Sequence, residues 1–284
     1  MIAITLVVAV IVYVAMVTRY GTQITPDGAY YGAMGRGAFV PRPYSLRTLP
    51  ILVRSVMAWR VIHAVSFLTF AVCAHILADA MGVSGLWGAV GVLTLPFIRQ
   101  SVVWPVLLDM PMLAVAALAA AVATVSPVLA VVIVALSVLI HERAPVWAAI
   151  YAAPFVPWEW LAFAACAGLI FAAVVYTSCE THPDEQRIEW LRSPVASAWA
   201  RHAPTLHDPR VWLLPLGVCA LGALWGWWPA LALVVGYAGC LVAQDRARIY
   251  GVACLPLAIG VMHILPVDLW PLLALNWFVS TTEV

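Results

Sequence analysis

Ionisable side chains stand beside long apolar stretches in three short segments of this chain. The first is Thr-Pro-Asp-Gly-Ala-Tyr-Tyr around Asp27, the second is Leu-Leu-Asp-Met-Pro-Met around Asp109, and the third is His141-Glu142-Arg143. A carboxylate or imidazole can transfer protons in catalysis, and an arginine can hold a phosphate through paired hydrogen bonds. These segments are therefore the first candidates for a chemical site.

Asp27 also has an ordinary structural explanation. Pro-Asp-Gly is typical of a turn, because proline fixes φ and glycine tolerates positive φ. Taken alone, the motif favours a turn over a catalytic base. The same polar loop, residues 18–50, carries further candidate ligand-binding side chains: Tyr30, Tyr31, Arg42 and Arg47.

Asp109 lies just before Pro111, where a helix is expected to begin, and an acid there favours the helix N-terminus. The sequence on both sides is strongly apolar. Because a carboxylate in such surroundings is costly unless it faces a partner or a polar cavity, we favour a functional role for Asp109.

His141, Glu142 and Arg143 interrupt the longest apolar region of the chain. One interpretation is a short loop whose charges lie among lipid headgroups. The other is a site that binds a phosphate and moves protons.

Composition determines the class of protein that must position these groups. The 284 residues are 65% hydrophobic and 10% charged, whereas soluble domains are about 45–50% apolar. We therefore expect an all-α, polytopic membrane protein with about 8–10 transmembrane or partly re-entrant helices, each needing roughly 20 residues for a full crossing. Its surroundings are membrane lipids, and we expect no nucleic-acid partner.

The apolar runs predict spans at 2–17, 52–78, 84–98, 104–124, 126–140, 146–177, 211–225, 227–243, 249–265 and 267–280. Several are short enough to be tilted, broken or re-entrant. The run 146–177 is either one kinked helix or two crossings, since Pro154 and Pro157 interrupt it. The first run is expected to be an uncleaved span. We expect one membrane domain over residues 1–284.

Three further groups of residues can be explained by structure alone, without a chemical role. In the polar stretch 178–210, an amphipathic helix interrupted at Pro194 and a solvated connector are equally favoured. His75 and Asp79 are one helical turn apart and predict a local hydrogen bond more than a metal site. The cysteines in apolar runs predict buried, inert thiols: Cys73, Cys166, Cys219, Cys240 and Cys254.

Membrane topology brings the polar segments together. The positive-inside rule places the arginine-rich loop 18–50 in the cytoplasm, although an active site outside the membrane would need the opposite orientation. If the intervening spans each cross, Asp27, Asp109 and His141-Glu142-Arg143 share one membrane face in either orientation. The sequence therefore predicts convergence of these segments.

Taken together, these motifs resemble the C-type glycosyltransferase superfold, whose members are polytopic enzymes that use polyprenyl-phosphate-linked sugars. The similarity runs over about residues 1–265 and depends on the order of short motifs. The motifs are DGAYY after the first span, VPRPYSLRTLP before the second, WPVLLDMPMLAVAALAAA, HERAPVWAAIYA and DRARIYGVACLP. The chain departs from the pattern because its first loop has a single acid where many members have an adjacent pair.

The resemblance implies an inverting hexosyl- or pentosyltransferase of the cell envelope, in a bacterial-type plasma membrane. Asp27 would be the general base, and Asp109 would orient the acceptor or hold a divalent cation such as Mg²⁺ or Mn²⁺. Phosphate and sugar contacts would come from Arg42, Arg47, His141, Glu142, Arg143, Tyr30 and Tyr31.

Two other classes of protein remain open. A lipid or small-solute transporter or flippase would suit broken helices and intramembrane charges. A non-catalytic membrane scaffold predicts polar clusters on both membrane faces.

Overall fold

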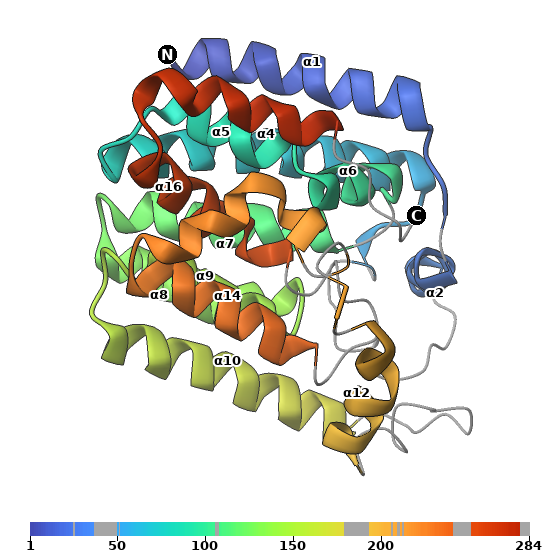
Figure 1. The fold of residues 1–284 in the computed structure, drawn as a ribbon. Helices are drawn as coiled ribbons and strands as arrows, with labels where there is room; N and C mark the ends of the chain where they lie inside the picture. Colours follow the sequence, from blue (N-terminus) through green and yellow to red (C-terminus); the bar gives the residue numbers. More distant parts are fainter. Residues whose placement is uncertain are drawn as a thin grey trace. The chain divides into compact units, whose positions relative to one another are not determined.

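In the computed structural model, the described residues are 1–24, 26–36, 50, 52–105, 108–178, 193–205, 207–208, 211, 213–240 and 251–278. All regular elements among them are helices (Figure 1). Contacts divide the chain into two compact units. Unit 1 comprises Met1–Ala89 and Ser101–His182, and unit 2 comprises Val90–Gln100 and Pro183–Val284. This division is finer than the single membrane domain predicted over residues 1–284.

Three helices in the described part are long and apolar enough to cross a membrane: α1 (Ile2–Tyr20), α4 (Val56–Ala80) and α10 (Trp158–Ser178). Helices α5 (Gly85–Leu93) and α6 (Pro96–Val103) form a further broken span or a re-entrant loop, with a bend of 62°. The prediction of a helical membrane protein is therefore confirmed. Among the described residues, three helices, or four with the bent pair, reach the length of a full span, and the other apolar helices are shorter.

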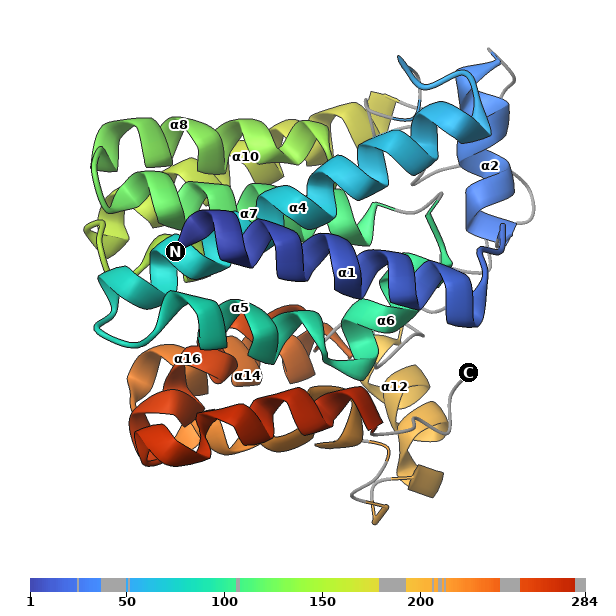
Figure 2. The same ribbon diagram turned by 90° about the horizontal axis from the view of Figure 1, so that it is seen from above.

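Helix α7 (Asp109–Ala123) is the centre of unit 1. It contacts α4, α8 (Pro127–Leu136) and α9 (Ala144–Ala152), and most of its residues are buried. Its many alanines let neighbouring backbones approach closely, which is how helices pack in membranes. Figure 2 shows α1 lying across α4, with which it is in contact.

The run 146–177 forms two separate helices in place of one kinked helix, and only the second is long enough to cross a membrane. Helix α9 ends at Ala152, and α10 begins at Trp158. The chain reverses between them, since a Cβ atom on Gly168 of α10 would lie 3.0 Å from Cγ of Pro145 at the start of α9. Pro154 and Pro157 stand in the connection between the helices. A proline has no backbone N–H to donate, and no helical hydrogen bond is lost there.

Unit 2 contains α12 (Pro194–His202), η4 (Leu214–Leu224), α14 (Trp227–Gly239), η5 (Gly251–Ala253), α16 (Cys254–Ile264) and η6 (Val267–Phe278). Helices η4 and α16 approach so closely that a Cβ on Gly222 would overlap the carbonyl oxygen of Leu257. Buried Asn276 of η6 joins η4, accepting a hydrogen bond from the Val218 N–H at 3.2 Å. Small residues and a polar side chain thus hold this unit together.

Apolar side chains cover the outer faces of the long helices of unit 1. On α10, Phe163 and Ile170 are 76% and 64% exposed, and on α1, Ile11 is 61% exposed. Such faces suit contact with lipid. Cys166 of α10 is also exposed, so the prediction of a buried thiol is wrong there, whereas Cys73, Cys219, Cys240 and Cys254 are buried as predicted.

The amphipathic helix predicted in 178–210 is present in part. Helix α12 begins at Pro194, and the first turn of a helix suits a proline. Val195 and Trp199 of α12 are exposed, and the His202 imidazole Nε2 lies 3.1 Å from the Cys240 carbonyl oxygen. Residues 179–192 of the predicted stretch lie outside the described residues.

Candidate functional site

The loop 18–50 contains a helix, α2 (Pro26–Gly35), in place of the turn predicted at Pro-Asp-Gly. Proline suits the first helical position because its missing N–H is not needed there. Asp27 therefore stands in the first turn of a helix, where a carboxylate favours the helix dipole. Asp27 and Tyr30 lie on α2, but their side chains are outside the described part of the structure.

Backbone contacts fix both ends of this region. Before α2, the Gln23 N–H donates to the Val103 carbonyl oxygen at 2.8 Å. At the end of α2, a Cβ on Gly35 would overlap the carbonyl oxygen of Val53 and lie 3.3 Å from Cα of Arg54. The absence of a side chain on Gly35 is what allows α2 to lie against residues 53–54.

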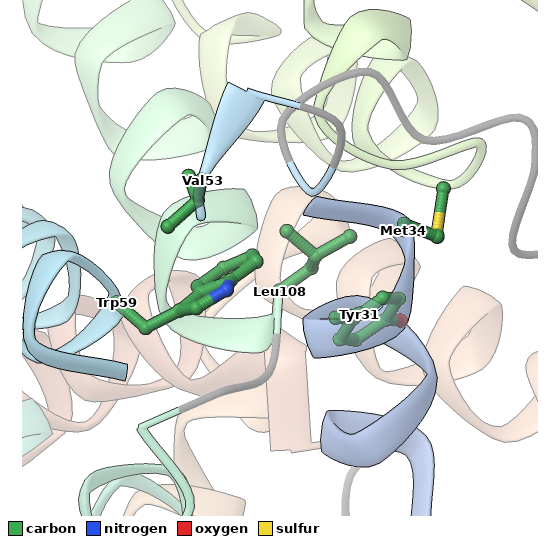
Figure 3. Packing of buried hydrophobic residues seen from close by; sticks show 5 residues of the cluster. All are labelled: Tyr31, Met34, Val53, Trp59 and Leu108. Atoms are coloured by element: carbon green, nitrogen blue, oxygen red, sulfur yellow. The ribbon is translucent and has the colours of Figure 1, made fainter. Parts of the chain in front are cut away.

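An apolar cluster joins α2 to the start of α4 and to the segment before α7 (Figure 3). Its buried members are Tyr31, Met34, Val53, Trp59 and Leu108. Partly buried side chains pack against them, Trp104 and Ile140 among them. Within this cluster, the rings of Tyr31 and Trp59 stack with centroids 5.9 Å apart and planes inclined by 30°.

The apolar cluster brings together the backbone segments that carry the predicted polar groups. Leu108 directly precedes Asp109, and Ile140 directly precedes His141. Tyr31 follows Asp27 by one helical turn of α2. These segments therefore meet at the end of unit 1 where α1 ends and α4 begins, as Figure 2 shows for α2.

Asp109 is the first residue of α7 and is 2% exposed. The helix begins there, slightly before the predicted start at Pro111. Helix α7 packs on α4, and the Asp109 carboxylate is close enough to the His63 imidazole of α4 for its charge to act on that ring. The surroundings of this buried carboxylate are otherwise apolar, and a carboxylate in such surroundings is costly.

His141 is buried, with 3% exposure, whereas Glu142 and Arg143 are partly buried. The Arg143 N–H donates to His141 Nδ1 at 3.1 Å, and Glu142 Oε2 lies 3.3 Å from the same nitrogen. A neutral ring cannot satisfy both contacts at Nδ1, and we assign Nδ1 as the acceptor because the main-chain donor is certain to carry a proton. Within this loop His141 is closed off, whereas Glu142 and Arg143 keep part of their surface open.

The guanidinium of Arg143 also turns back over the imidazole of His141, with Nη2 at 3.4 Å from Nε2. The segment is therefore folded on itself as a compact unit of imidazole, carboxylate and guanidinium. Such a unit offers groups that can bind an anion and exchange a proton.

Other predicted site residues are placed differently. Tyr31 is 2% exposed and is engaged with Trp59. Arg42 and Arg47 lie outside the described residues. Among the described side chains, no group of three or more His, Cys, Asp or Glu residues is arranged to hold a metal ion.

His75 and Asp79 form the predicted local contact, with Nε2 and Oδ2 3.2 Å apart. The same imidazole meets Thr5 of α1, whose hydroxyl oxygen is 2.7 Å from Nδ1. Asp79 Oδ1 in turn accepts a hydrogen bond from the Gly85 N–H at 2.6 Å. This chain of contacts joins α1, α4 and α5 and has a structural role.

The sequence motifs do not single out Trp59 or His63 as site residues. Trp59 belongs to the apolar cluster, and His63 lies near enough to Asp109 for the charge of that carboxylate to act on it. Their spacing of one helical turn was the available signal, because it places both on one side of α4.

Comparison with protein-family models, with curated proteins and with solved structures gives no match. The resemblance to the C-type glycosyltransferase superfold therefore stays a prediction from the sequence motifs.

Proposed function

We propose that this protein is a multi-pass membrane glycosyltransferase that moves a sugar from a polyprenyl phosphate to an acceptor hydroxyl, with inversion at the anomeric carbon. The observation that carries the proposal is the apolar cluster, which gathers the segments of Asp27, Asp109 and His141-Glu142-Arg143 at one end of unit 1. A reaction with a base, an orienting acid and an anion site needs such groups in one place.

In the proposed reaction, the Asp27 carboxylate takes the proton of the acceptor hydroxyl. The acceptor oxygen then forms a bond to the anomeric carbon as the bond between that carbon and the phosphate oxygen breaks. The phosphate leaves with the bonding electron pair. Asp109 orients the acceptor, and the guanidinium of Arg143, together with Arg42 and Arg47, stabilises the charge that develops on the phosphate.

The membrane supplies the donor in this proposal. The apolar outer faces of α1 and α10 suit lipid, and the polar segments come together at one end of the unit that contains both helices. A polyprenyl phosphate can reach such a site sideways from the bilayer, with its chain in the lipid and its phosphate near the polar groups. We place the protein in a bacterial-type plasma membrane.

The test is sugar transfer by the full chain in proteoliposomes, with radiolabelled polyprenyl-phosphate hexoses and pentoses as donors. Wild type should transfer at least one sugar, and Asp27→Asn should lower the rate by at least about 100-fold, as expected for loss of a general base. Glu159→Gln is a matched control, because Glu159 is an exposed carboxylate at the start of α10. A wild type inactive with the whole panel, or an Asp27→Asn variant at full rate, refutes the proposal.

A transporter is the second candidate, and the 62° break between α5 and α6 is the observation that favours it. Broken helices are common around transported substrates. This alternative predicts movement of an intact lipid or solute across the proteoliposome membrane without any glycosidic product.

A further inference from the structure

Two buried side chains on one face of α4 have polar atoms that the described residues leave unsatisfied. Trp59 and His63 are one helical turn apart, and each is 1% exposed. The Trp59 indole N–H and both ring nitrogens of His63 lack a hydrogen bond of ordinary geometry within the described structure. Buried polar groups are nearly always hydrogen-bonded in native proteins, so each exception calls for an explanation.

Aromatic rings surround these two side chains. Tyr31 of α2 stacks on Trp59 at 5.9 Å. Tyr13 of α1 lies beside His63, with ring centroids 6.1 Å apart. Flat apolar faces therefore lie next to unsatisfied donors and acceptors.

Polar groups approach His63 from two more helices. The Asp109 carboxylate at the start of α7 acts on the imidazole through its charge, and the Ser101 backbone of α6 is near enough for a weak contact. Arg60, the nearest cation along α4, is exposed and donates a hydrogen bond to the Thr22 hydroxyl at 3.1 Å.

The donor and acceptor types at this place select a class of ligand. An indole only donates, a carboxylate only accepts, and a neutral imidazole does each at one nitrogen. A hydroxyl group does both, so a ring with several hydroxyls can hydrogen-bond to the indole and the imidazole together and also donate to the neighbouring carboxylate. A phosphate only accepts and would be repelled by Asp109.

We propose that Trp59 and His63 form the subsite for a neutral sugar ring, next to Asp109. The inference rests on the proposed glycosyl transfer and assigns the sugar to α4 rather than to Tyr30 and Tyr31. The indole N–H donates to a sugar oxygen, and the imidazole and the Asp109 carboxylate share a sugar hydroxyl. Both α4 side chains are closed to solvent in this structure, so binding requires Tyr31 to leave Trp59 and Tyr13 to leave His63.

The first arm of the test measures stability without any ligand. His63→Leu removes both ring nitrogens and keeps apolar bulk, and removing an unsatisfied group is neutral or stabilising. The thermal midpoint of helix loss, followed by circular dichroism in detergent, should not fall by more than about 3 °C in this variant. A larger fall would show that the imidazole has a structural partner, and the subsite would be wrong.

The second arm measures binding, with methyl glycosides of common hexoses and pentoses as probes. At least one glycoside should raise the thermal midpoint of wild type and of Trp160→Phe, a control at a tryptophan that is 50% exposed on α10. The shift should be absent in Trp59→Phe and His63→Leu. If no glycoside shifts wild type, or if these variants respond as wild type does, the subsite is refuted.

The two proposals fail separately. Glycoside binding through Trp59 in a protein that transfers no sugar from any polyprenyl phosphate would keep the subsite and refute the transfer. Transfer at the wild-type rate in Trp59→Phe would refute the subsite and leave the transfer standing.

Discussion

Tyr31 of α2 stacks on Trp59 of α4, with ring centroids 5.9 Å apart and planes inclined by 30°. This contact joins the first polar loop to the second long helix and lies beside Leu108, the residue before Asp109. An aromatic pair contributes about 0.5–1.5 kcal/mol beyond the burial of its area. The position of α2, and with it the position of Asp27, therefore depends on a small number of contacts that can be altered one at a time.

Gly35→Ala should separate α2 from the rest of unit 1. The added Cβ would overlap the Val53 carbonyl oxygen, so we expect the free energy of unfolding to fall by about 1–3 kcal/mol, with a parallel loss of sugar transfer. Gly32→Ala in the same helix is the matched control, because its Cβ would meet only Arg36 Nη1 at an ordinary 3.5 Å. Equal stability of the two variants, measured by denaturation in mixed micelles, would contradict the position of α2.

Thr5→Val should weaken the packing of α1 on α4. It removes the hydroxyl that lies 2.7 Å from His75 Nδ1 and leaves a buried imidazole nitrogen without that partner. Hydrogen bonds between membrane helices contribute about 0.6 kcal/mol on average and at most about 1.7 kcal/mol, so we expect a loss in this range.

Thr124→Val is the control for this change, since the Thr124 hydroxyl donates within its own helix end to the Ala121 carbonyl oxygen at 2.7 Å. Equilibrium unfolding of both variants in mixed micelles measures the difference. A Thr5→Val variant no less stable than Thr124→Val would show that the contact between α1 and α4 contributes nothing.

In unit 2, Gly222→Ala and Gly260→Ala should each force η4 and α16 apart. A Cβ on Gly222 would lie 2.7 Å from the Val261 nitrogen, and a Cβ on Gly260 would lie 3.0 Å from the Gly222 carbonyl carbon. We expect a loss of about 1–3 kcal/mol for each, because backbone atoms cannot move aside as a flexible side chain can.

Gly226→Ala provides the comparison for these variants, since a Cβ added there would have nothing within 4 Å and the φ of 175° is extended. Loss of helical circular dichroism on heating should occur at a lower temperature in Gly222→Ala and Gly260→Ala than in Gly226→Ala. Coincident unfolding curves would mean that the two helices do not pack through these glycines.

Apolar periodicity and proline positions predicted much of the helical pattern. The spans at 2–17 and 52–78 correspond to α1 and α4, and the prolines at 154 and 157 mark the reversal inside 146–177. Pro96 likewise stands at the break inside the run 84–98, which was predicted as one span. A proline has a local effect on its own backbone, so its consequence can be derived from the sequence.

The sequence could not reveal contacts that depend on packing between distant helices. Pro-Asp-Gly favours a turn locally, yet the chain forms α2 there and covers Trp59. The burial of His63 next to Asp109 likewise arises from the contact of α4 with α7. Local propensity carries no information on such contacts, so Trp59 and His63 emerge as site residues only from the fold.

If Asp27 and Asp109 act on the same reacting sugar, the losses of kcat/KM caused by their two substitutions cannot be independent of each other. The most direct measurement is kcat/KM for sugar transfer by Asp27→Asn, Asp109→Asn and the double variant, in the same proteoliposomes. Residues that act as a unit are strongly non-additive, so the double variant should be no slower than the slower single variant. Losses that multiply in the double variant would show that the two carboxylates act in separate places and would contradict a common site.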